Sequence, residues 1–132
     1  MKRWHWLEAV DLIVMHREVI AEFGGRPGLR DQALLESAAA RPKHLAAYEA
    51  ASVFELAAAY AFGLARNHPF IDGNKRISLV AAFTFLALNG WEVEAEEAAT
   101  VLVFLDLAAG KLTEKELARW LERNSRTTKA GR

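Results

Sequence analysis

A histidine, a carboxylate, a glycine and two cations stand together in one stretch of the chain, His68-Pro69-Phe70-Ile71-Asp72-Gly73-Asn74-Lys75-Arg76. A histidine imidazole can be neutral at physiological pH, so His68 can accept a proton from a hydroxyl. Asp72 offers the hard carboxylate oxygens that Mg²⁺ binds beside substrate phosphates. A base and a metal-binding carboxylate close to two cations are the groups that phosphoryl or nucleotidyl transfer requires.

The second half of this segment is suited to an anion. Gly73 lets the backbone approach an anion with no Cβ in the way. Asn74, Lys75 and Arg76 are expected in the first turn of a helix, where backbone N–H groups lack partners within the helix and can bind phosphate. Lys75 adds a point charge, and Arg76 adds a planar guanidinium that fits bidentate phosphate contact.

Each of these residues also has an ordinary structural explanation. A single histidine is more often a hydrogen-bonded structural residue than a catalyst, and Asp72 or Asn74 can serve only as a helix N-cap. Pro69 and Phe70 are expected to be structural, with Phe70 inserted in the core to anchor the loop. No capping rule requires all of these residue types in this order, so the combination favours chemistry.

The segment resembles the signature of the Fic/Doc family and is most similar to its Doc (death-on-curing) branch. The Doc pattern His-x-Phe-x-Asp/Asn-Ala/Gly-Asn-Lys-Arg is matched throughout His68–Arg76. Typical Fic sequences have a glycine at the position of Lys75 and a second arginine at the position of Leu79. The similarity extends to the stretches Phe23–Pro42 and Phe83–Gly90, so it covers nearly the whole chain.

The resemblance implies a toxin of a type II toxin–antitoxin system that transfers the γ-phosphate of a nucleoside triphosphate such as ATP to a Ser or Thr hydroxyl of a protein. It implies that His68 is the base, that Asp72 holds Mg²⁺, and that Gly73–Arg76 bind and neutralise the phosphates, with Arg76 counted among the catalytic residues. The implied partners are an antitoxin protein and a translation factor such as elongation factor Tu as substrate, although no residue of the chain points to that factor.

Two alternatives remain open. The first is AMP transfer by the same residues, as in typical Fic proteins; the side chain of Lys75 would fill space in the anion pocket, which favours the kinase instead. The second is a catalytically weak module whose main function is to bind an antitoxin. Packing alone does not require His68 and Asp72, which disfavours binding as the sole role.

The inhibitory Ser/Thr-x-x-x-Glu-Gly/Asn helix of the family has no match in the sequence. We therefore expect inhibition by a separate antitoxin chain.

Composition is typical of one folded domain. The 132 residues leave room for a single core, and 52% hydrophobic residues suffice to fill it. With 17 basic and 17 acidic residues, the formal net charge of zero gives no general attraction to nucleic acid, which disfavours an RNA-directed toxin. The absence of cysteine excludes disulfides and thiolate metal sites.

The pattern of charges also bears on location. Glu8 and Asp11 interrupt the apolar core that a signal peptide would need, and the longest charge-free apolar run, Ile77–Trp91, is too short to span a bilayer. We expect a cytoplasmic protein that binds neither a membrane nor nucleic acid directly.

Apolar residues at helical spacing predict about six helices and no sheet. Lys43–Ala51 is ambiguous, and Trp91–Val93 is expected as a short extended piece. The predicted helices are Trp6–Phe23, Asp31 as N-cap to Ala40 with Pro42 as the stop, Ser52 as N-cap to Asn67, Asn74–Leu88, Glu96–Ala109, and Thr113 as N-cap to Glu122.

The sequence therefore predicts an all-α fold, and the resemblance implies that residues 1–124 form a compact Fic/Doc-like bundle. Residues 125–132 are expected to be a disordered basic tail. The third and fourth helices are the most apolar and should pack together, so that the chemical loop between them is held rigidly. Trp91 and Trp120 are expected to be packing residues. Trp4 and Trp6 fit either a packed satellite cluster or a partner-binding surface, and packing is favoured. His16 and His44 are expected to be ordinary residues.

Overall fold

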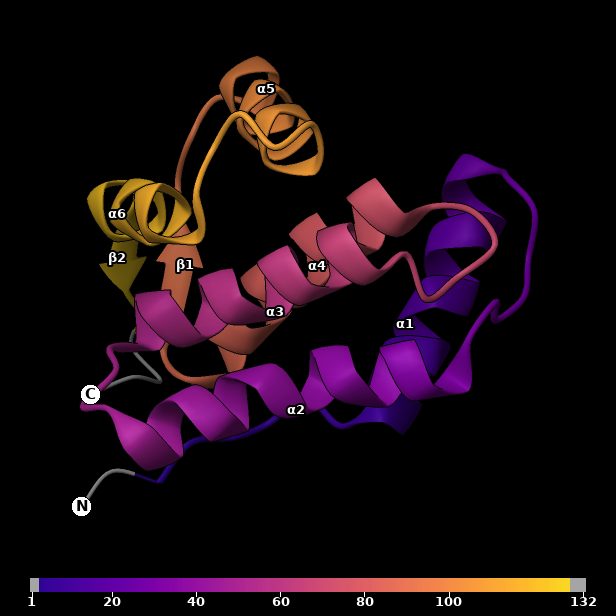
Figure 1. Ribbon diagram of the computed structural model, residues 1–132. Helices are drawn as coiled ribbons and strands as arrows, with labels where there is room; N and C mark the ends of the chain where they lie inside the picture. The colour runs from indigo at the N-terminus through magenta and orange to yellow at the C-terminus, as the bar shows by residue number, and fades with distance from the viewer. Residues whose placement is uncertain (1–2, 129–132) are drawn as a thin grey trace.

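Two helices, α3 (Val53–Asn67) and α4 (Asn74–Leu88), form the centre of the molecule. The computed structural model describes residues 3–128, and within them the two helices lie side by side (Figure 1). Eleven of the fifteen residues of α3 are buried, which is why its sequence is apolar on nearly all sides. The predicted all-α fold and the predicted central pair are confirmed.

Within residues 3–128, four further helices cover this pair (Figure 1). Helix α1 packs against α4, whereas α2 and α6 pack against α3, and α5 contacts both central helices from one side. No helix within residues 3–128 is long and apolar enough to cross a membrane. The bounds of these helices are Ala9–Phe23 for α1, Gln32–Tyr48 for α2, Glu97–Ala108 for α5 and Glu114–Arg123 for α6.

Local capping signals set most of the helix ends. The Ser52 hydroxyl accepts from the backbone N–H of Glu55 while the Glu55 carboxylate accepts from the backbone N–H of Ser52, and this capping box begins α3. Helix α1 begins at Ala9 rather than at the predicted Trp6, because the Asp11 carboxylate accepts from the backbone N–H of Glu8 and caps the helix there.

Helix α2 does not end before Pro42, as the sequence predicted, but continues to Tyr48. A proline inside a helix removes one hydrogen bond and costs about 3 kcal/mol. Burial offsets this cost, since Pro42 itself lies in the core and the buried Ala38 packs closely on α3. A Cβ built on Gly63 would lie 3.3 Å from the Ala38 backbone, so small residues allow the two helices this close approach.

A small antiparallel sheet, β1 (Trp91–Val93) with β2 (Ser125–Thr127), corrects two predictions. The sequence predicted no sheet and a disordered tail from residue 125, but these three-residue strands are too short for an alternating pattern to show. The Arg126 guanidinium lies 3.3 Å from the Glu92 carboxylate and 3.0 Å from that of Glu94, which ties the strands together. The rest of the predicted tail, residues 129–132, lies outside the described residues.

The segment before α1 is tied to the core by Tyr60. The buried Tyr60 hydroxyl accepts from the backbone N–H of Leu7 at 2.8 Å and donates to the carbonyl of Leu7 at 2.9 Å. Burial raises the pKa of Tyr60, so the hydroxyl keeps the proton that it donates. Trp4 and Trp6 pack beside it on Phe85, and all four tryptophans pack against the core, as predicted.

We expect Tyr60→Phe to lower the free energy of unfolding by about 1–3 kcal/mol, because both backbone groups of Leu7 would be left without this partner. Urea unfolding followed by circular dichroism measures the loss. Tyr48→Phe is the matched control, since Tyr48 is 86% exposed and should lose almost nothing. Equal midpoints for the two variants would contradict this account of the N-terminal segment.

Candidate active site

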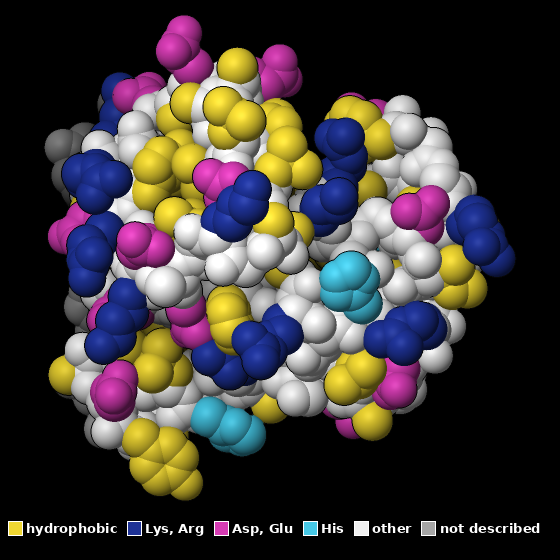
Figure 2. Space-filling view, turned by 45° about the horizontal axis from the view of Figure 1, so that its top comes forward, with side chains coloured by type: hydrophobic (Ala, Val, Ile, Leu, Met, Phe, Trp, Pro, Cys, Tyr) yellow, Lys and Arg dark blue, Asp and Glu magenta, His cyan; other side chains and the backbone are white. Residues whose placement is uncertain are grey.

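The predicted chemical residues lie in and just after the loop between α3 and α4. This loop reaches toward the connection between α1 and α2 at one end of the molecule (Figure 1). A cleft of about 470 Å³ opens there, and His68, Asp72 and Gly73–Arg76 line it. Apolar side chains also line the cleft, from the end of α1, with Val19 and Phe23, and from α5, with Val101 and Leu105. On this side of the molecule a notch appears, with Lys and Arg side chains and a histidine beside it (Figure 2).

His68 stands at the point where α3 ends. Its backbone is left-handed, with φ 49° and ψ 57°, a conformation that residues with a Cβ adopt infrequently. Pro69 disfavours a further right-handed turn at His68, so the helix stops at Asn67 and the chain changes direction. The imidazole is exposed on the cleft, where it is accessible to a ligand.

The Asp72 carboxylate is fixed by two backbone donors. Its Oδ2 accepts from the N–H of Arg26 at 3.0 Å, and its Oδ1 accepts from the N–H of Gly73 at 2.8 Å. These hydrogen bonds, that of Arg26 first, hold the pKa of the Asp72 carboxyl below its usual value. A Cβ on Gly25 would lie 2.9 Å from Oδ2, so a glycine is needed where the α1–α2 connection passes the carboxylate.

Asp72 fits a Mg²⁺ ligand, because it is ionised, exposed and has lone pairs beyond those used by the backbone. Within residues 3–128, no three His, Asp or Glu side chains are grouped to hold a metal ion. A Mg²⁺ ion at Asp72 would therefore take most of its ligands from water and from a phosphate-bearing ligand, the usual arrangement for this ion.

The start of α4 presents donors to the cleft. Gly73 is the N-cap of α4 with φ 75°, and the first-turn N–H groups of Asn74 to Arg76 have no acceptor within the helix. The Arg76 guanidinium lies 3.9 Å from the centre of the Phe23 ring. Stacking of this kind leaves the in-plane N–H donors available for an anion. The predicted anion-binding half of the motif is thus assembled at one helix end.

Asn74 has a structural task in addition. Its buried side chain accepts from the Phe70 N–H at 3.1 Å and donates to the Phe70 carbonyl at 2.9 Å, which closes the loop on itself. Phe70 is 2% exposed, as expected of the residue that anchors the loop.

His16 is one of the residues whose part in the site the sequence analysis did not predict. It is buried, its Nε2 lies 2.7 Å from the carbonyl oxygen of Asp72, and its ring stacks on Phe70 at 3.8 Å. Because the Asp72 carbonyl can only accept, Nε2 carries the proton in this contact. The signal was present in the sequence, since His16 continues the buried stripe of Leu12 and Val19 on α1.

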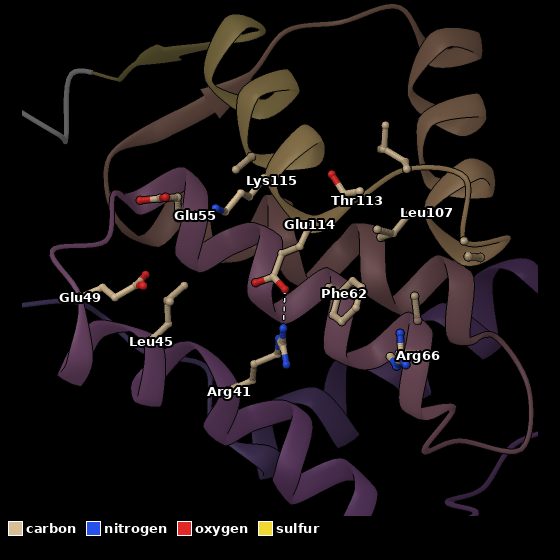
Figure 3. A pocket seen from close by; sticks show the side chains of 15 residues that line it. Arg41, Leu45, Glu49, Glu55, Phe62, Arg66, Leu107, Thr113, Glu114 and Lys115 are labelled. Atoms are coloured by element: carbon tan, nitrogen blue, oxygen red, sulfur yellow. Dashed lines mark hydrogen bonds and ion pairs between the residues drawn. The ribbon is translucent and has the colours of Figure 1, made fainter.

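A second and larger cavity, of about 750 Å³, lies between α2, α3, α6 and the end of α5 (Figure 3). Arg41 and Glu114 point toward one another across it and form an ion pair. Phe62 lies in its wall with the guanidinium groups of Arg41 and Arg66 over its ring. The chemical loop lines the smaller cleft, so the smaller cleft is the candidate site.

Comparison with known proteins agrees with the geometry of the loop. A model of the Fic/DOC family matches residues 6–86, which include the entire chemical segment. The protein named "Protein kinase doc" of Escherichia phage P1 is 36% identical over 115 residues, covering 86% of this chain and 90% of the phage protein. The protein named "Toxin Doc" of Mycolicibacterium smegmatis is 44% identical over 78 residues, covering 56% of this chain and 58% of that protein.

We expect the Asp72 carboxyl to titrate below the ordinary range of an aspartate, because two N–H donors stabilise its ionised form. Its contribution to stability is then present above the pKa of an unfolded aspartate and is lost as the pH falls through the lower folded-state pKa. Carbon-detected NMR titration of the carboxyl measures this. The same titration in 8 M urea is the control and should return the ordinary value; identical curves in the two states would contradict the two backbone hydrogen bonds.

Proposed function

Because the chain belongs to the Fic/DOC family, we propose that it is a Doc-like toxin that transfers the γ-phosphate of a nucleoside triphosphate to a Ser or Thr hydroxyl of a protein. One observation carries the proposal: His68, Asp72 and the donor-rich start of α4 line the same cleft. The name of the phage P1 relative, a protein kinase, supports phosphoryl transfer rather than AMP transfer.

The neutral His68 imidazole takes the proton from the acceptor hydroxyl as the oxygen attacks the γ-phosphorus. The first-turn N–H groups of α4, with Lys75 and Arg76, bind the phosphate oxygens and stabilise the charge that spreads over them in the transition state. Asp72 would hold Mg²⁺, which supplies further neutralisation of the phosphates. The bond to the β-phosphate oxygen breaks, and the nucleoside diphosphate leaves.

The proposed partners follow from the resemblance to Doc toxins. An antitoxin would neutralise the protein, and the apolar part of the cleft, with Val101, Leu105 and Phe23, is suited to a helix laid against it. We propose a translation factor such as elongation factor Tu as the protein substrate, and hence action in the cytoplasm. The resemblance is the support for this substrate.

His68→Ala should lower the rate of transfer roughly 10²–10⁴-fold, which is the usual contribution of a general base, and should leave the fold intact. Incorporation of phosphate into the proteins of a cell extract measures the rate, and circular dichroism checks the fold. His44→Ala is the matched control, because His44 lies exposed on α2. Full activity of a folded His68→Ala variant would remove His68 from its proposed role.

Labelled ATP distinguishes the two transferases. Lys75 lines the cleft where adenylylating relatives have glycine, so its side chain should crowd the pose in which the α-phosphate faces the acceptor. We expect protein labelling from γ-labelled ATP and none from α-labelled ATP when the protein and Mg²⁺ are added to extract. Label from the α position would establish AMP transfer instead. Label from neither position, with a folded protein, would favour the antitoxin-binding module.

A further inference from the structure

One arginine outside the chemical loop binds the backbone that carries His68. Arg30 lies in the connection between α1 and α2, 38 residues before His68 in the chain. Its Nε donates to the carbonyl of His68 at 2.6 Å, and its Nη2 donates to the carbonyl of Asn67 at 2.8 Å. Its own backbone N–H donates to the carbonyl of Pro69 at 2.7 Å. Three consecutive carbonyls therefore accept hydrogen bonds from one residue.

Two of these carbonyls lie on either side of the His68 Cα, so the contact with Arg30 affects the backbone conformation of His68. The carbonyl of Asn67 belongs to the peptide plane before the His68 Cα, and the carbonyl of His68 belongs to the plane after it. The two planes are related by φ and ψ of His68, so a rigid fork that holds both carbonyls holds both angles. Those angles are the left-handed ones, which a histidine does not prefer when nothing constrains it.

Charge supports the same arrangement. The last carbonyls of α3 have no donors within the helix, and the end of the helix dipole that they form attracts a cation. The backbone of the α1–α2 connection is also paired with the loop, since the N–H of Ile71 donates to the carbonyl of Gly28 at 3.0 Å and Leu29 bridges to Phe70. Arg30 is thus presented to His68 by a segment that is itself fixed.

We propose that Arg30 is a positioning residue, which locks His68 in the left-handed conformation and so directs the imidazole into the cleft. This proposal rests on the proposed role of His68 as the base. Among the described residues, those lining the cleft do not include Arg30, so Arg30 acts through His68 rather than on the substrate.

Arg66 provides a matched control for the possibility that Arg30 only neutralises the C-terminal end of α3. It lies in the last turn of α3 and brings the same charge to the same helix end, but its guanidinium lies over the Phe62 ring, in the wall of the larger cavity. If Arg30 served only the helix dipole, Arg30→Met and Arg66→Met would have similar effects.

The first test is the backbone of His68, read from the NMR scalar couplings that report φ. We expect a positive φ in the wild-type protein and in Arg66→Met, and a shift toward negative φ in Arg30→Met. Circular dichroism establishes that all three proteins are folded. A positive φ retained by His68 in folded Arg30→Met overturns the proposal. This measurement does not depend on activity, so it decides the role of Arg30 even if the wild-type protein transfers no label and the proposed function fails.

The second test uses the rate of γ-label transfer from Mg·ATP to extract proteins. We expect Arg30→Met to lower the maximal rate at least tenfold with an unchanged half-saturating Mg·ATP concentration, and Arg30→Lys to lower it less. Arg66→Met should retain the wild-type rate. In a His68→Ala background, Arg30→Met should cause no further loss, because the residue through which it acts is gone. A maximal rate for Arg30→Met equal to that of Arg66→Met, or the same fold-loss with and without His68, overturns the proposal.

Discussion

The burial of Phe70 is the constraint on which the site depends. Its ring stacks on the buried His16, its backbone is paired with Leu29, and its N–H and carbonyl are both bound by the Asn74 side chain. Burying a phenylalanine side chain is worth about 1.5–3 kcal/mol. A left-handed residue with a side chain costs on the order of 1–3 kcal/mol, so the anchor and its hydrogen bonds together can offset the strain at His68. His68, the proposed base, lies two residues before Phe70, and Asp72 lies two residues after it.

The cleft combines a cationic part with an apolar part although the chain as a whole is neutral. The chemical segment offers backbone donors, Lys75 and Arg76, and Asp72 is the single negative group of the motif. The residues of α1 and α5 that line the cleft are apolar, and the Phe23 ring also supports the Arg76 guanidinium. A formal charge of zero therefore excluded a general attraction for polyanions without excluding a local anion site. Sites for small anions are built from a helix end and a few side chains. The positive charge of these few side chains does not show in the net charge of the whole chain, because acidic residues elsewhere cancel it.

The sequence predicted the helices where local chemistry decides the structure. Ser52 with Glu55 begins α3, Pro69 and Gly73 separate α3 from α4, and the predicted bounds of α4 match the structure. Tertiary packing decides the rest, as at Pro42, where burial against α3 outweighs a strong helix-breaking signal. The three-residue strands are another such case, because their pairing joins segments more than thirty residues apart.

Within the site, the same division applies. The motif residues could be identified because they are consecutive, whereas His16 and Arg30 reach the loop from 56 and 38 residues away in the chain. No local pattern gives the partner of a buried histidine or of a loop arginine, since both contacts are made to backbone carbonyls, which every residue possesses.

The close approach of Gly25 to the Asp72 carboxylate has a consequence for how related sequences are interpreted. Gly25 has a φ of 114°, and any side chain there would meet Oδ2, so the glycine and the aspartate, 47 positions apart, form one unit. A relative that keeps every residue of the loop but carries a bulky side chain at this glycine would still have the carboxylate. That side chain would occupy the space in which the carboxylate is held. In this chain, two separated segments, and not the nine-residue stretch alone, therefore hold the carboxylate that we propose as the Mg²⁺ ligand, and the loss of a glycine in the first helical connection would remove its support.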